Sequence, residues 1–185
     1  MAIDPQDAFI ADLNGVFAQH SSMWTIYNES IKLLVTVSAL PLLAAAALLA
    51  AGERVDFTTL PPLLVCTLVV TPVLVFVTLG VVIHYRLTVL WYARGLNGFR
   101  AIYFSALQSA EATIQPPMPT DPRYPANYEF TGPMGLIVHG SAVLNAGYLF
   151  LAGSSFGGWL PGSIVALVCV AALELWYWWN CHRYP

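Results

Sequence analysis

The sequence predicts an all-α integral membrane protein built around a four-helix bundle. Only 9% of its 185 residues are charged and 58% are apolar, whereas a soluble domain carries about 25% charged residues. Four apolar stretches each come close to the roughly 20 residues that a helix needs to cross a bilayer. These predicted spans are 33–51, 60–83, 134–152 and 159–179.

An amphipathic helix is expected over residues 1–21, ahead of a membrane domain formed by residues 22–185. Pro5 suits the first position of a helix. Phe9, Leu13 and Phe17 then recur on one helical face. Ser21 and its neighbour Ser22 are expected to end this helix.

The first two spans contain prolines, and the second is expected to continue beyond the membrane. Pro41 predicts a kink, and Pro72 lies inside the second span. Residues 84–112 contain no proline, and their apolar side chains recur every three or four positions. We therefore expect either a long cytoplasmic extension of the second helix or a separate surface helix, ending near Thr113. Off the apolar stripe lie Arg86, Arg94, Asn97 and Arg100.

The second half of the chain begins with a proline-rich connector over residues 115–133, which is expected to be extended. The third span carries glycines and other small residues, which allow helices to approach closely in lipid. Residues 153–158 predict a glycine and serine turn. The fourth span ends in an aromatic cluster typical of a membrane interface.

The arginines predict which way the chain crosses the membrane. With four crossings, both termini and the segment 84–133 share one side. That side holds five arginines, whereas Arg54 alone lies on the other side. Because positive residues mark the cytoplasmic side, both termini are predicted to be cytoplasmic. A bacterial cell inner (plasma) membrane is the simplest location. The five arginines are Arg86, Arg94, Arg100, Arg123 and Arg183.

A small set of polar residues is expected in the cytoplasmic third of the bundle. Its members are His84, Arg86, His139, Asn145 and Glu174. Because an ionisable group in a membrane helix costs about 2.5–3.5 kcal/mol on insertion scales, Glu174 and His139 need partners. Three interpretations stay open: a polar clasp that fixes helix register, a permeation or gating site, and a b-type haem held by His84 and His139.

The motifs and the charge of the chain indicate which classes of activity and partner are expected. No zinc-protease, nucleophile-elbow or phosphate-loop motif is present, so an enzyme is not favoured, and no metal site or cofactor other than the alternative haem is expected. A nucleic-acid partner is not expected, because the net charge is −3 and no basic run occurs. Arg94 and Arg100, interleaved with aromatic residues, indicate a basic surface for lipid headgroups or a cytosolic partner.

These observations favour a small inner-membrane protein that contacts the lipid bilayer and self-associates as a homo-oligomer. We expect it to act as a channel-like or signalling effector gated from the cytoplasmic side through residues 84–133. The alternatives are the haem-binding redox subunit and a non-catalytic accessory subunit of a larger membrane complex.

Overall fold

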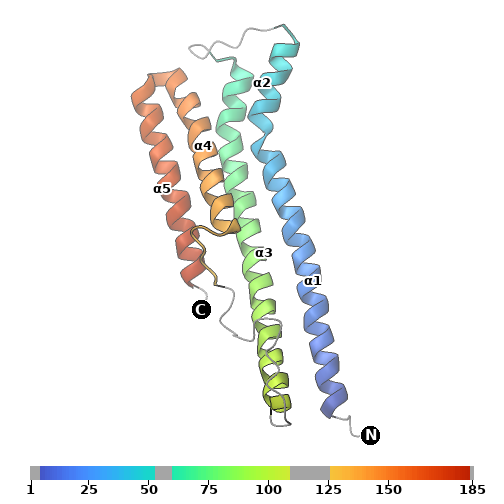
Figure 1. The fold of residues 1–185 in the computed structure, drawn as a ribbon. Helices are drawn as coiled ribbons and strands as arrows, with labels where there is room; N and C mark the ends of the chain where they lie inside the picture. Colours follow the sequence, from blue (N-terminus) through green and yellow to red (C-terminus); the bar gives the residue numbers. More distant parts are fainter. Residues whose placement is uncertain (1–4, 53–59, 109–125, 184–185) are drawn as a thin grey trace. The chain divides into compact units, whose positions relative to one another are not determined.

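The computed structural model describes residues 5–52, 60–108 and 126–183, and all regular secondary structure among these residues is helical. The predicted all-α character is therefore confirmed. The helices are α1 (Pro5–Ser38), α2 (Leu40–Ala50), α3 (Pro62–Gln108), α4 (Pro133–Gly157) and α5 (Trp159–Arg183), labelled in Figure 1.

The chain divides into two compact units, and each is described by itself. The first unit contains Met1–Asn28 and His84–Asn127. The second contains Glu29–Ile83 and Tyr128–Pro185. The long helices α1 and α3 thus contribute residues to both units.

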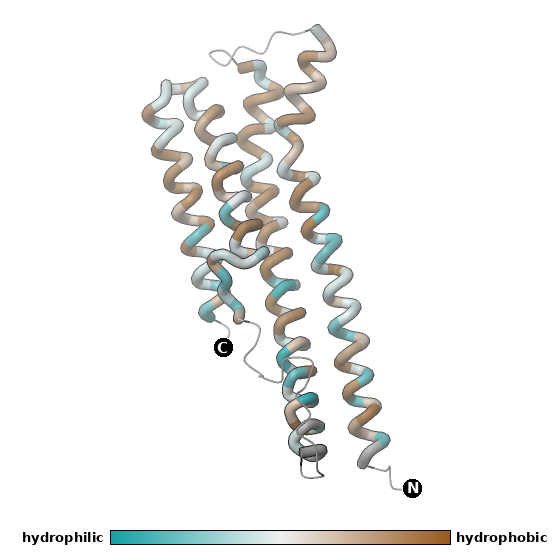
Figure 2. Tube along the Cα trace, in the orientation of Figure 1, coloured by the Kyte–Doolittle hydropathy of each residue, from teal (hydrophilic) through white to brown (hydrophobic). Residues whose placement is uncertain are grey.

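Within the part of the chain that the structure describes, three helices are long and apolar enough to cross a membrane: α3, α4 and α5. Helices α4 and α5 contain the predicted spans 134–152 and 159–179, and α3 contains the predicted span 60–83 from residue 62 onward. Figure 2 shows the matching run of hydrophobic residues along the early part of α3 and along α4 and α5. A fourth candidate span consists of α1 and α2 together, which meet at a bend of 41°.

The break between α1 and α2 lies at Ala39, two residues before Pro41. Proline has no N–H and its ring clashes with the preceding turn, so a regular helix cannot continue through it without distortion. The N–H of Ala39 is shared between the carbonyls of Val35 and Thr36, each at 3.2 Å. The kink expected at Pro41 is therefore present and lies at the start of α2.

The second unit has an apolar core formed by three helices. Leu48 of α2 packs with Leu64 and Leu68 of α3 and with Tyr148 and Ala152 of α4. In lipid, such a core is held by close packing, because the surrounding acyl chains are as apolar as the side chains themselves.

Helices α4 and α5 form an antiparallel hairpin (Figure 1). The turn between them is shorter than the expected 153–158, because α4 continues to Gly157 and Gly158 alone, at φ 84°, reverses the chain. A Cβ on Gly153 would lie 2.8 Å from Cα of Gly162, and one on Gly162 would lie 2.7 Å from the carbonyl oxygen of Phe150. The two backbones touch here, which only glycine permits.

In the first unit, the early part of α1 packs against the late part of α3. The rings of Phe9 and Phe99 lie 5.4 Å apart, edge to face. The break expected at Ser21 and Ser22 is absent, and α1 runs through both residues. The helix continues through the two serines, and Oγ1 of Thr25 donates a hydrogen bond to the carbonyl of Ser21 at 3.1 Å.

The second predicted helix does continue without interruption, since α3 is helical as far as Gln108. Its predicted end near Thr113 lies outside the described residues, as does most of the proline-rich connector. Two of the polar side chains that lie off the apolar stripe of α3 are nevertheless buried. Arg86 and Asn97 are buried, with 7% and 4% exposed, although they fall off the apolar stripe. Their spacing places them on the same helical face as Leu90, which is also buried.

Candidate functional site

The structure brings together His139 of α4 and Glu174 of α5. Nδ1 of His139 lies 2.6 Å from Oε1 of Glu174, and Nε2 lies 3.0 Å from the carbonyl oxygen of Phe130. The two side chains are 25% and 31% exposed. We call His139, Glu174 and the Phe130 carbonyl the clasp.

The partners of His139 restrict where protons sit in the clasp. A carbonyl oxygen can only accept, so Nε2 must carry a proton that it donates to Phe130. The other ring nitrogen and Glu174 share one further proton. Either an imidazolium donates to the carboxylate, or a carboxylic acid donates to neutral Nδ1. The net charge of the pair is zero in both forms, which suits a group at apolar depth.

The clasp holds residues 128–132 over the start of α4. The phenol of Tyr177, which is fully buried, donates to the carbonyl of Glu129 at 3.3 Å and lies 3.4 Å from its N–H. The ring of Phe130 packs against the imidazole of His139, with centroids 4.7 Å apart. A Cβ on Gly135 would collide with the backbone oxygens of Glu129 and Phe130. Gly135 is therefore what lets this segment lie directly on α4.

Asn145 lies on α4, six residues beyond His139, and takes no part in the clasp. Its side chain is 1% exposed, and neither its amide oxygen nor its amide nitrogen has a hydrogen-bond partner in the described part of the chain. Oγ1 of Thr71 on α3 is also buried and unpaired there. These orphaned polar groups cost free energy in an apolar core.

His84 and Arg86 belong to the first unit and are described within it. Nη1 of Arg86 donates a 2.6 Å hydrogen bond to the carbonyl of Asn127. His84 is exposed, and its ring lies edge to face with that of Tyr85 at 5.6 Å. The guanidinium of Arg86 thus ties α3 to the residues that precede the clasp segment in sequence.

The predicted basic surface of Arg94 and Arg100 is partly buried. Nη1 of Arg100 donates to the side-chain oxygen of Asn97 at 3.0 Å. His20 belongs to the same unit and lies outside the apolar part of α1. Burial lowers the pKa of His20, and the positive charge of Arg100 lowers it further. This surface therefore disfavours an additional proton on His20.

The geometry gives no support to a haem held by His84 and His139. An iron ligand needs a free imidazole nitrogen, and both nitrogens of His139 face protein acceptors. Among the described residues, no group of three histidine, cysteine or acidic side chains is placed to hold a metal ion.

Sequence reasoning singled out His139 and Glu174 but missed the parts of the site that are not titratable. The Phe130 carbonyl, Gly135 and Tyr177 carry no motif. Gly135 belongs to the small residues of the third span and Tyr177 to the aromatic cluster of the fourth, whereas no sequence signal pointed to the Phe130 carbonyl.

The chain was compared with protein families, curated proteins and solved structures, and none of the three comparisons gives a match. Its function is therefore argued from the clasp and from the helices that carry it.

Proposed function

We propose that the chain is a multi-pass membrane protein that self-associates and acts as a channel-like effector, with the clasp as its gate. The observation that carries this proposal is the His139–Glu174 pair, which lies inside two apolar helices and is still a quarter to a third exposed.

The depth of the pair supports a functional role. His139 follows the start of α4 at Pro133 by six residues, which corresponds to about 9 Å along the helix. Charged and strongly polar groups at such depth face protein or a water-filled cavity rather than lipid. The exposed part of the pair therefore requires a cover, which a second copy of the chain or a water path supplies.

Proton transfer gives the gate its mechanism. The clasp is neutral while Nδ1 and the carboxylate share one proton. Adding a proton leaves a net positive charge, and removing one leaves a net negative charge. Either change weakens the hydrogen bond that holds α4 to α5, while Nε2 keeps its proton and its bond to the Phe130 carbonyl.

The direction of gating follows from the arginine distribution. We place both termini, the clasp and residues 84–133 on the cytoplasmic side of a bacterial inner membrane. Loss of the clasp would then couple cytoplasmic pH, or a partner that binds this side, to the opening of a path between subunits.

The test uses the full chain reconstituted in liposomes, with ion flux recorded over a pH series and particle mass measured on the same preparation. We expect an oligomer with pH-dependent flux, and a changed pH dependence in His139→Gln. His84→Gln is the matched control, because His84 is exposed, takes no part in the clasp and makes its ring contact with Tyr85.

A monomer without flux at any pH overturns the proposed function. Flux that keeps its pH dependence in His139→Gln removes the gate from the clasp. Recovery of one fixed partner in stoichiometric amount, together with an unstable isolated chain, supports the accessory-subunit alternative instead.

A further inference from the structure

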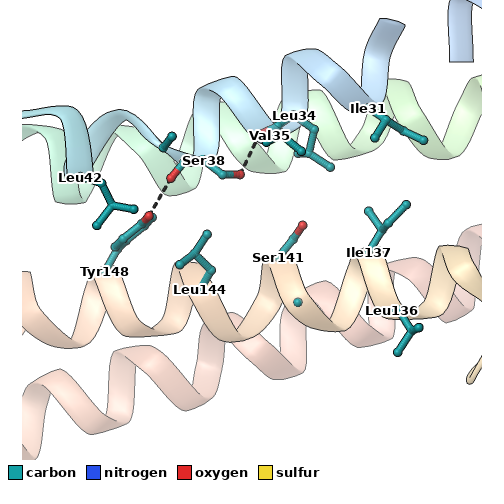
Figure 3. Close-up of a pocket in the computed structure, with 12 residues that line it drawn as sticks. Ile31, Leu34, Val35, Ser38, Leu42, Leu136, Ile137, Ser141, Leu144 and Tyr148 are labelled. Atoms are coloured by element: carbon teal, nitrogen blue, oxygen red, sulfur yellow. Dashed lines mark hydrogen bonds between the residues drawn. The ribbon is translucent and has the colours of Figure 1, made fainter. Parts of the chain in front are cut away.

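A groove in the second unit runs between the bent pair α1 and α2 on one side and α4 on the other (Figure 3). Its volume is about 340 Å³. Leu34 and Tyr148 are buried in its floor, whereas Val35, Leu42 and Leu136 are about two-thirds exposed along its rim.

The lining is largely aliphatic and carries three hydroxyls, on Ser38, Ser141 and Tyr148. The hydroxyl of Ser38 donates to the carbonyl of Leu34 at 2.8 Å. The phenol of Tyr148 donates to the carbonyl of Ser38 at 2.6 Å. Figure 3 shows both bonds at the bend between the helices. Since these two donors are already used within the protein, the groove offers a ligand a wall that is aliphatic apart from the Ser141 hydroxyl.

The shape of the groove matches one hydrocarbon chain. Its lining runs from Ile31 to Leu42, and eleven helical steps span about 16 Å. An elongated aliphatic groove of this length is complementary to an extended acyl chain that lies along the helices.

One end of the groove lies near charged side chains and the other end is apolar, as the headgroup and the chain of a lipid are. Near the Ile31 end, Nζ of Lys32 and Oε1 of Glu29 form an exposed ion pair at 2.6 Å. The other end lies at the bend, where the Tyr148–Ser38 hydrogen bond is surrounded by apolar lining residues that include Leu42 and Leu144. A charged mouth and an apolar end are complementary to a phospholipid headgroup and its chain.

We infer that this groove binds one acyl chain of a phospholipid, with the headgroup beside Lys32. A groove in lipid that stayed empty would lose the dispersion contacts of its lining atoms, and a lipid chain restores them. The site is separate from the clasp and does not depend on the proposed channel function.

The test replaces a glycine that lines the groove with a residue whose side chain occupies the groove. Gly140 lines it, and a Cβ added there meets nothing within 4 Å, so Gly140→Leu places a side chain into open space. Gly147→Leu is the matched control, because Gly147 lies two turns further along α4, is equally open and does not line the groove.

The full chain is reconstituted in vesicles of phosphatidylethanolamine and phosphatidylglycerol that contain a trace of phosphatidylcholine with a diazirine on its acyl chain. After illumination, labelled residues are mapped by mass spectrometry. We expect label on Ser38 and Ser141 in the wild type and in Gly147→Leu, and loss of that label in Gly140→Leu.

A second pair of variants protects the test against misfolding of Gly140→Leu. Val35→Trp places a large ring on the groove rim, and Val165→Trp places the same ring on exposed α5. Only Val35→Trp should reduce labelling of the groove. The inference is overturned if both groove variants leave the labelling intact, or if labelling is equally strong along α5. A cross-link between two copies through the groove also overturns it.

Discussion

Helices α4 and α5 have the same length and similar hydropathy, yet the second unit uses them differently. In the most apolar stretch of α4, 39% of residues are buried, against 11% in α5. Helix α4 packs against α2 and α3 on one side and α5 on another, whereas α5 contacts the rest of its unit along one narrow face. Two helices with the composition of membrane spans therefore differ in how much of their surface is buried within the unit.

The comparison teaches where a polar group can be tolerated. Asn145 of α4 is enclosed with no partner in the described residues, and Glu174 of α5 is paired and partly exposed. An enclosed amide on the central helix costs stability, whereas a paired carboxylate on the peripheral helix remains within reach of water or a second copy. Function is therefore expected on the flank that α4 and α5 share.

The largest effect is expected where the two helices touch. Gly162→Val puts its side chain against the Phe150 carbonyl and the backbone of Ser154, so the hairpin must separate. We expect a loss of about 3 kcal/mol in the free energy of unfolding, measured by denaturant titration in detergent micelles. Gly147→Val, which enters open space, should be nearly silent. Equal losses in both variants would contradict the close approach of the two backbones.

A smaller effect of opposite sign is expected at Asn145. Because its buried amide has no partner in the described residues, Asn145→Leu should raise the free energy of unfolding by about 1 kcal/mol. Asn180→Leu on α5 is the control, because it removes an existing 2.8 Å bond to the Trp176 carbonyl and should bring no gain. Destabilisation by Asn145→Leu would show that the amide is paired across subunits.

The smallest effect is expected on the outward face of α5. Leu175 is 66% exposed, so Leu175→Ala should change the free energy of unfolding by less than about 0.5 kcal/mol. Leu173→Ala, two residues away and buried, should cost about 2 kcal/mol. If Leu175→Ala changes the particle mass of the reconstituted chain, this face packs on protein rather than on lipid.

Much of the helical layout follows from local sequence. Long apolar runs predict the helices that hold the spans, and Pro41 predicts the bend between α1 and α2. The absence of proline after the second span correctly predicts that α3 continues. The break at Ser21 was wrong, because a serine interrupts a helix only where no continuing pattern surrounds it. That the four spans form one bundle stays a prediction.

The sequence by itself determined that Glu174 and His139 need partners, because charge at apolar depth is costly whatever the fold. Only the tertiary structure decided that they partner each other, since the sequence places His84 and Arg86 in the same predicted polar set. The tertiary structure also decided that the Phe130 carbonyl contacts His139. A backbone group becomes part of a site through close approach, and Gly135 permits that approach by having no side chain. Contacts between residues far apart in sequence depend on helix packing, which the periodicity of a single helix does not encode.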